Sequence, residues 1–302
     1  MQNSLPKPRL ADLSITPAQI DQFHHQGYLI LPDLLTPEQI DRIVDRFDPI
    51  FATQFDTGVY PDEWYGRPGL SQPNATRQMT GLWRCDRTLA GFTLSGAIAR
   101  INARLMGWDA ARYGFDACWI KPPDAPPVAF HRNSAYVASL EPTSVVTCWL
   151  ALSHATAAAG TLEVVPGSHR WRCTDRVRFL HAPRDDYRAP LWQAAKEAGV
   201  PSPEILPIEL PPGSAICFHG DLWHGSDCNQ TSDQTRRSLA VSTLPAAVQF
   251  RPSSDQGYIF GRHRRRGETE LDESFFPILW SQDGYRTAFL EDYLKGFDPY
   301  AR

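Results

Sequence analysis

The first third of the chain spaces its apolar residues as amphipathic helices do. Thr16-Pro17 indicates a helix start, because a threonine side chain caps free amide groups and proline suits the first turn. Thr36-Pro37-Glu38-Gln39 repeats the signal as a capping box before an apolar stripe, and a third helix is expected over 95–106. With a short apolar strand at 28–31, residues 14–110 are predicted to form a helix-rich N-terminal part.

The pattern changes in the middle of the chain. Short apolar runs at 145–150, 160–165 and 214–218 are expected to be strands, and Pro-Gly, Gly-Ser and Pro-Pro-Gly turns separate them. Several short strands with such punctuation indicate a sandwich or barrel. Residues 112–245 are therefore predicted to form a β core, interrupted by a polar, helical insertion at 173–204.

The last part of the chain, 246–302, mixes aromatic side chains with charges and is expected to pack on the β core, near its mouth. A length of 302 residues suits one domain with elaborations. The expected fold class is mostly β with flanking helices, in a single domain over 1–302.

Composition and charge exclude several function classes. The 30 basic and 34 acidic residues give a net charge of -4, without the basic excess that nucleic-acid binding needs. No apolar run approaches the roughly 18 residues that cross a bilayer, and 1–9 resembles neither a signal nor an anchor. Six singly spaced cysteines fit a reducing cytoplasm. The basic run 262–266 is interpreted as a solvated loop, with an anion-attracting lid as the alternative.

Two histidines stand out by their surroundings. His131 opens His-Arg-Asn-Ser-Ala-Tyr after a proline-rich loop, and His224 lies in Trp-His-Gly-Ser. Non-haem ferrous iron needs two imidazoles and one carboxylate on one face, with positions left for oxygen and a chelating cosubstrate. Residues two apart on a strand share a face, so Asn133 stands where the acid is expected. Taken alone each histidine is more often structural, but the combination favours a metal site.

An arginine-led strand candidate follows the second histidine. Arg236 can form a paired, charge-assisted contact with the far carboxylate of a dicarboxylate whose 2-oxo acid end chelates iron. Arg237 alternates to the other face, where a surface ion pair is expected.

Together these features resemble the phytanoyl-CoA dioxygenase family of iron(II)- and 2-oxoglutarate-dependent oxygenases. The family pattern is a histidine, an acid two residues on, a tryptophan, Pro-Gly-Ser-His, a distal His-Gly-Ser and an arginine-led strand. The corresponding residues here are His131, Asn133, Trp149, Pro166-Gly167-Ser168-His169, His224-Gly225-Ser226 and Arg236, and 257–261 and 270–276 also resemble bacterial members. The resemblance implies a double-stranded β-helix core (jelly roll, cupin-like), with iron at His131, Asn133 and His224 and with 2-oxoglutarate at Arg236 and Trp149.

The departure from the family lies at Asn133, because an amide oxygen is a poorer donor than a carboxylate and brings no negative charge to a dication. Family halogenases of other branches carry alanine or glycine there, which opens more room than asparagine, so halogenation is not inferred. Three explanations stay open: Asn133 ligates weakly in a working enzyme, the chain is a non-catalytic relative, or the residue was changed deliberately. Asp221 is the nearest substitute acid, but its odd offset from His224 indicates a turn residue.

Other polar residues have less specific interpretations. His169 is expected to bond backbone across a tight turn, and His219 to do no more than orient a ligand. Trp149 is expected to fill the core beside the cosubstrate. Tyr136 and Trp83-Arg84 are candidates either for a substrate pocket or for plain packing.

The function expected is oxidation, by default hydroxylation, of a small organic substrate, with 2-oxoglutarate converted to succinate and carbon dioxide. One alternative is a catalytically impaired or non-catalytic relative that acts as a ligand-binding or partner protein. Another is a cupin-like isomerase or zinc hydrolase, against which Arg236 argues. Neither the substrate nor the oligomeric state can be read from the sequence.

Overall fold

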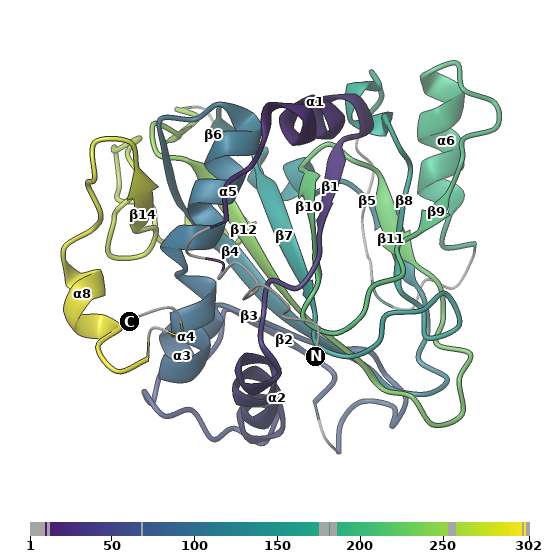
Figure 1. Cartoon of the computed structure of the whole chain (residues 1–302), viewed down its shortest axis with the longest axis horizontal. Helices are drawn as coiled ribbons and strands as arrows, with labels where there is room; N and C mark the ends of the chain where they lie inside the picture. Colours follow the sequence, from purple (N-terminus) through teal and green to yellow (C-terminus); the bar gives the residue numbers. More distant parts are fainter. Residues whose placement is uncertain are drawn as a thin grey trace, which may run out of the picture.

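The computed structural model describes residues 10, 13–67, 69–174, 181, 186–252, 258–297 and 299. Its centre is a pair of mostly antiparallel sheets with helices outside them (Figure 1). The larger sheet runs in the order β1 (Tyr28–Leu31), β10 (Ala215–His219), β7 (Val146–Ala151), β12 (Arg236–Pro245), β4 (Ala110–Lys121), β3 (Arg77–Thr80) and β2 (Glu63–Tyr65), and β14 (Ile278–Ser281) also pairs with β4. The smaller sheet runs β5 (Val128–His131), β11 (His224–Ser226), β8 (Leu162–Val164) and β9 (Leu206–Pro207), and β13 (Gln249–Phe250) pairs separately with β6 (Leu140–Glu141).

The predicted fold class, mostly β with flanking helices on a jelly-roll core, is confirmed. The two sheets remain separate and do not close into one barrel. The division into one domain over 1–302 stays a prediction.

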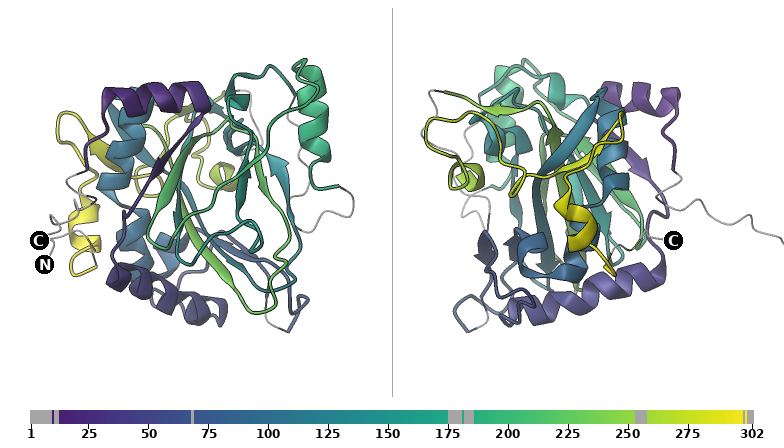
Figure 2. Two further views of the ribbon diagram at one scale, coloured as in Figure 1. Left: turned by 45° about the vertical axis from the view of Figure 1, so that its right-hand side comes forward. Right: turned by 90° about the vertical axis from the view of Figure 1, so that its left-hand side faces the viewer.

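Helices lie mainly on the outer face of the larger sheet (Figures 1 and 2). They are α1 (Pro17–Gln26), α2 (Pro37–Phe51), α3 (Leu82–Cys85), α4 (Arg87–Thr93), α5 (Gly96–Met106), α6 (Ala189–Glu197), α7 (Tyr258–Gly261) and α8 (Phe289–Tyr293). The predicted starts of α1 and α2 are confirmed, since Thr16 and Thr36 each form a full capping box with the glutamine three residues on. α6 instead packs against β5 of the smaller sheet.

The core between the helices and the larger sheet is a continuous apolar cluster. Phe23 of α1 and Phe47 of α2 belong to it, together with Cys118, Cys148 and other side chains of the sheet. The thiols of Cys118 and Cys148 are buried there as small apolar groups. Among the described helices none is long and apolar enough to span a bilayer.

Two parts of the chain differ from the sequence-based expectation. The helix-rich N-terminal part also contributes β2 and β3, and the C-terminal extension contributes β14 to the larger sheet. Within the predicted insertion 173–204, α6 is the described helix, and 175–180 and 182–185 lie outside the described residues. β3 was missed because it is short and three of its four residues are polar.

Candidate active site

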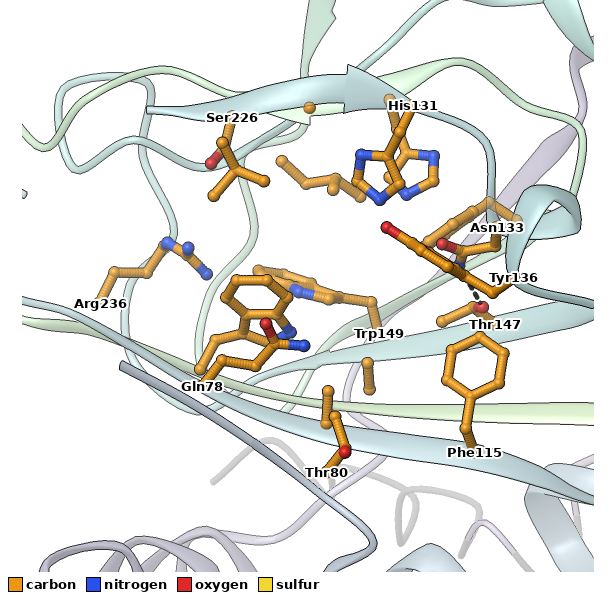
Figure 3. Close-up of a pocket in the computed structure, with 18 of the residues that line it drawn as sticks. Gln78, Thr80, Phe115, His131, Asn133, Tyr136, Thr147, Trp149, Ser226 and Arg236 are labelled. Atoms are coloured by element: carbon orange, nitrogen blue, oxygen red, sulfur yellow. Dashed lines mark hydrogen bonds between the residues drawn. The ribbon is translucent and has the colours of Figure 1, made fainter. Parts of the chain in front are cut away.

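The two candidate ligand histidines meet on neighbouring strands of the smaller sheet. His131 ends β5 and His224 begins β11, and the two residues lie directly opposite each other in the antiparallel register. Figure 3 shows the His131 ring projecting toward the larger sheet. Cross-strand neighbours share one face of the sheet, and both histidines line the same cavity. Their ring centroids are 4.2 Å apart, with 52° between the ring planes. The structure therefore brings together the two imidazoles that the sequence singled out.

Backbone carbonyls fix the tautomer of both rings. His131 Nδ1 lies 2.9 Å from the Ala129 carbonyl oxygen, and His224 Nδ1 lies 2.8 Å from that of Leu222. Because a carbonyl only accepts, each Nδ1 carries the proton and donates, which leaves Nε2 with a free lone pair. Burial lowers the pKa of His131 to about 4, and burial, followed by the nearby charge of His131, lowers the pKa of His224 well below its usual value. At neutral pH both rings are neutral nitrogen donors.

Asn133 follows His131 at the start of the 3₁₀ turn η2 (Asn133–Val137) and is buried beside it. Its amide nitrogen donates to Thr147 Oγ1 over 2.8 Å, and the Thr147 hydroxyl lies 2.7 Å from that of Ser242. Figure 3 shows the amide oxygen on the side of the histidine rings. The third predicted ligand position therefore presents an oxygen, but a neutral one.

Among the described residues, no acid takes the place of the missing carboxylate. Within the described part of the chain, no group of three or more His, Cys, Asp and Glu side chains could hold a metal ion. Asp221 lies in a turn, where its carboxylate accepts from Ser134 Oγ over 2.5 Å and pairs with Arg132 at 3.7 Å. The interpretation of Asp221 as a turn residue is confirmed.

Arg236 begins β12 at the other end of the same cavity (Figure 3). Its side chain is 4% exposed, its guanidinium carbon lies 5.5 Å from the centre of the Trp149 ring, and Nη1 donates to Ser238 Oγ over 3.1 Å. Burial lowers the pKa of Arg236 to about 10. Nε has no hydrogen-bond partner and no carboxylate pairs with this cation among the described residues. A buried cation without an anion is costly, so the structure leaves a ready position for a carboxylate from a ligand.

A cavity of about 110 Å³ connects the histidines, Asn133 and the arginine. Arg236 is the one charged side chain among its described lining residues, and most of the rest are apolar or aromatic. The lining also includes Gln78, Thr80, Phe115, Ala117, Trp119, Val128, Tyr136, Thr147, Trp149, Leu162, Phe218, Gly225, Ser226, Ala240 and Ile259. The cavity thus has a cationic end and a larger apolar remainder.

Several of these cavity residues were not foreseen. Gln78 and Thr80 come from β3, and Phe115, Ala117 and Trp119 come from β4, in each case at alternate positions of one strand. Two-residue alternation was the available signal, but it identifies a shared face and not which face borders a cavity. Tyr136 lines the cavity, which was one of the two interpretations of this residue. Ile259 also lines the cavity and belongs to the C-terminal extension.

A second buried basic side chain, next to Arg236, was also missed. Lys121, the last residue of β4, lies opposite Arg236 in the strand register. Its amino group donates to Ser226 Oγ over 2.9 Å and to the Asp227 carbonyl. Burial, with a smaller effect of the Arg236 charge, lowers the Lys121 pKa well below its usual value. This end of the cavity is therefore rich in donors and poor in acceptors.

The remaining candidates lie away from the cavity. Trp83 packs in the core against Tyr113, and Arg84 pairs with Asp62, so the packing interpretation of this pair is the correct one. His169 contacts the His24 carbonyl oxygen at 3.0 Å, the structural role expected of it. His219 Nδ1 accepts the backbone amide proton of Asp221.

Arg237, next to Arg236 in β12, does not line the cavity, as strand alternation predicted. Its expected surface ion pair is not seen among the described residues.

In the basic run 262–266, Arg262 pairs with Asp62 at 3.4 Å and Arg265 pairs with Asp272, and neither lines the cavity. These contacts favour the solvated loop over an anion-attracting lid.

Comparison with known proteins gives consistent matches. The family model described as phytanoyl-CoA dioxygenase (PhyH) matches residues 23–238. A phytanoyl-CoA dioxygenase of Arabidopsis thaliana is 26% identical over 250 residues, which cover 72% of this chain and 85% of that protein. The structure of SnoK, a non-heme alpha ketoglutarate dependent carbocyclase from nogalamycin biosynthesis, has a TM-score of 0.68 at 19% identity over 88% of this chain and 96% of its own. The epimerase SnoN, solved with Fe3+, alpha ketoglutarate and nogalamycin RO, has a TM-score of 0.65 at 16% identity over 87% and 98%.

Proposed function

The chain belongs to the phytanoyl-CoA dioxygenase family of 2-oxoglutarate-dependent non-haem iron enzymes, and we propose that it hydroxylates a small, largely apolar and uncharged organic molecule. The observation that carries the proposal is one cavity with two neutral imidazoles and an amide oxygen at one end and, at the other, a guanidinium that pairs with no carboxylate of the described residues. His131, His224 and Asn133 are the proposed iron ligands. Arg236 and Trp149 are the proposed 2-oxoglutarate contacts.

The donor set fits a divalent iron. Both Nε2 atoms are unprotonated because the backbone carbonyls hold the protons on Nδ1, so no proton has to leave before metal binds. Nitrogen and oxygen donors of this kind suit ferrous iron, although the neutral amide contributes less than a carboxylate would. Iron and 2-oxoglutarate, when bound, supply the activation of oxygen, with succinate and carbon dioxide as co-products.

Arg236 suits the far carboxylate of 2-oxoglutarate. A guanidinium that is buried, lies over an aromatic ring and lacks an anion gains most from a paired, charge-assisted contact. Holding that end of the cosubstrate directs its other end toward the histidines. Trp149 forms the floor beneath the guanidinium and excludes water from the contact.

The rest of the cavity supports the substrate class. Phe115 and Tyr136 lie on the side away from Arg236 (Figure 3), and Ile259 joins them in the lining. These side chains offer apolar contacts and no charge, so a charged substrate would lose its hydration without compensation. Thr80 and Gln78 provide uncharged polar groups elsewhere in the lining.

The test measures succinate release from 2-oxoglutarate with iron(II) and oxygen against a panel of uncharged apolar metabolites. We expect substrate-dependent succinate release and a product that carries one atom of labelled oxygen. The same assay is run on an Asn133→Asp variant. Faster succinate release in this variant than in the parent would show that the neutral third ligand limits activity. Substrate turnover without 2-oxoglutarate consumption would instead indicate an isomerase or hydrolase, and binding without turnover in both proteins would indicate a ligand-binding relative.

A further inference from the structure

The backbone around Asn133 lies just beyond the strand pairing that places the two histidines. β5 ends at His131, where it pairs with His224 of β11. The 3₁₀ turn η2 begins at Asn133, and the Arg132 side chain before it does not cap the turn. Contacts outside the ladder therefore have to set where Asn133 lies relative to the two rings.

The carboxylate of Asp221 contacts the residues on both sides of Asn133. Its Oδ1 accepts from Ser134 Oγ over 2.5 Å and lies 3.7 Å from Arg132 Nη1. The Ser134 backbone amide also donates to the Gly220 carbonyl oxygen over 2.9 Å. Because an ionised carboxylate only accepts and a guanidinium only donates, the direction of both side-chain contacts is fixed. The start of η2 is thus held to the turn that carries Asp221.

That turn leads directly into the second histidine. His219 Nδ1 accepts the Asp221 amide proton over 3.0 Å. One residue after Asp221, the Leu222 carbonyl oxygen lies 2.8 Å from His224 Nδ1 and sets the tautomer of that ring. A single carboxylate therefore links the segment of Asn133 to the segment that presents His224.

We propose that Asp221 is a positioning residue, which holds Asn133 beside the two histidines through its contacts with the residues on either side. This inference rests on the proposed function, since it assigns Asn133 to the metal site. The neutral amide makes such a contact valuable. A carboxylate is drawn to a dication by its charge, whereas an amide gains less from the metal and depends more on being placed in advance.

A contribution to the metal site can be separated from a contribution to stability. The Asp221 side chain is 31% exposed, and exposed pairs contribute little to the free energy of unfolding. Asp283 offers a matched control, because its carboxylate also accepts from a serine hydroxyl, Ser281 Oγ, over 2.5 Å. Asp283 belongs to the C-terminal extension and does not line the cavity.

Co²⁺ binding to the whole metal-free chain under anaerobic conditions tests the proposal. Titration calorimetry gives the affinity, and the visible cobalt spectrum reports the geometry of the ligands. Asp221→Ala is expected to weaken Co²⁺ binding about 10-fold or more and to shift the visible bands, as is usual for groups that support a metal ligand. Asp221→Asn keeps an oxygen that can accept from Ser134 and should lose less. Asp283→Ala should keep the parental affinity and spectrum, and the urea midpoints of both alanine variants should shift by similar small amounts.

The route through Ser134 has a test of its own. Ser134→Ala is expected to weaken Co²⁺ binding in the same direction as Asp221→Ala. The double variant should lose clearly less than the product of the two fold-losses, because the two side chains act through one contact. Losses that multiply in full would show that Asp221 does not act through Ser134.

The outcomes separate this inference from the function on which it rests. Parental Co²⁺ affinity and spectrum in Asp221→Ala, or an equal loss in Asp283→Ala, would overturn the positioning role of Asp221. Loss of Co²⁺ binding in His131→Ala would show that the metal site stands even then. Unchanged Co²⁺ binding in both His131→Ala and His224→Ala would overturn the proposed function. Should Asp221→Ala not fold, judged by its circular dichroism, Asp221→Asn and Ser134→Ala are judged by the same criteria.

Discussion

The two ends of the cavity differ in charge, although both are equally buried. At the proposed metal end, His131 and His224 are neutral imidazoles and Asn133 is a neutral amide. At the other end Arg236 is a cation, with the Lys121 side chain behind it. No carboxylate lines either end in the described part of the chain. The positive charges of a metal dication and of the guanidinium would therefore both have to be compensated by the negative charge of a bound ligand.

This contrast explains why a dianionic 2-oxo acid suits the cavity. One carboxylate can meet the guanidinium and the other, with the adjacent oxo group, can reach the metal end. In relatives with an acid, part of the charge at the metal comes from the protein, whereas here the cosubstrate has to supply all of it. Binding of metal and of 2-oxoglutarate is therefore expected to be strongly cooperative.

The largest effect is expected from removing the cation. Arg236→Gln should raise the Kd for 2-oxoglutarate about 100-fold or more, because the carboxylate would lose a buried, charge-assisted partner. Titration calorimetry with Co²⁺ present measures the change. Arg237→Gln is the matched control, since its side chain does not line the cavity, and it should leave the Kd unchanged. A similar loss of 2-oxoglutarate affinity in both variants would show that Arg236 is not a specific partner of the carboxylate.

Because His131 is neutral and buried, the free energy of unfolding is expected to depend on pH. The His131 pKa is about 4 in the folded chain and 6.5 is its usual value, so the unfolded chain takes up a proton first as the pH falls. Stability of the metal-free protein should therefore be greatest above pH 6.5 and decline toward pH 4. Between pH 7 and 5 His131 contributes a loss of about 2 kcal/mol.

Urea unfolding of the metal-free protein at pH 7 and pH 5 measures this loss. A His131→Gln variant keeps a similar shape but does not titrate, so its decline should be smaller by the His131 share. An identical decline in the parent and the variant would contradict a neutral, buried His131.

Removing the aromatic floor of the cationic end should have a smaller effect. Trp149→Leu is expected to raise the Kd for 2-oxoglutarate about 3- to 10-fold, since an aromatic face contributes modestly to holding a guanidinium. Trp149→Phe keeps a ring and should lie between the parent and the leucine variant. A leucine variant with parental affinity would remove Trp149 from the account of the cosubstrate contacts.

The smallest effect is expected in the basic run. Arg265 is 63% exposed and pairs with Asp272, so Arg265→Gln should change stability by less than about 0.5 kcal/mol and leave the 2-oxoglutarate Kd unchanged. Affinity measurements as above check it. A rise in Kd comparable with that of Trp149→Leu would revive the lid that was the alternative interpretation of this run.

Local signals in the sequence predicted the parts of the fold that depend on local chemistry. The capping boxes at Thr16 and Thr36 work through residues three apart, so both helix starts could be read directly. Arg236 was separable from Arg237 because a strand alternates its faces. These features can be read without knowing how the strands pair with one another.

What could not be predicted depends on strand register. Thr147 meets Asn133 and Ser242 only because β7 pairs with β12 in a particular register, and no local pattern encodes that pairing. Gln78 and Thr80 were missed because polar residues that face a buried cavity look like solvent-facing ones in a sequence. The sequence thus located the histidines and the arginine, but not the Thr147 and Ser242 hydroxyl pair beside the asparagine.

The most direct measurement for the central claim is an anaerobic titration of the protein with iron(II) in the presence of 2-oxoglutarate, followed in the visible range. The account predicts a weak charge-transfer band that saturates at one iron per chain and is absent in both His131→Ala and His224→Ala. A band of undiminished strength in either variant, or no band in the parent and in Asn133→Asp, would contradict it.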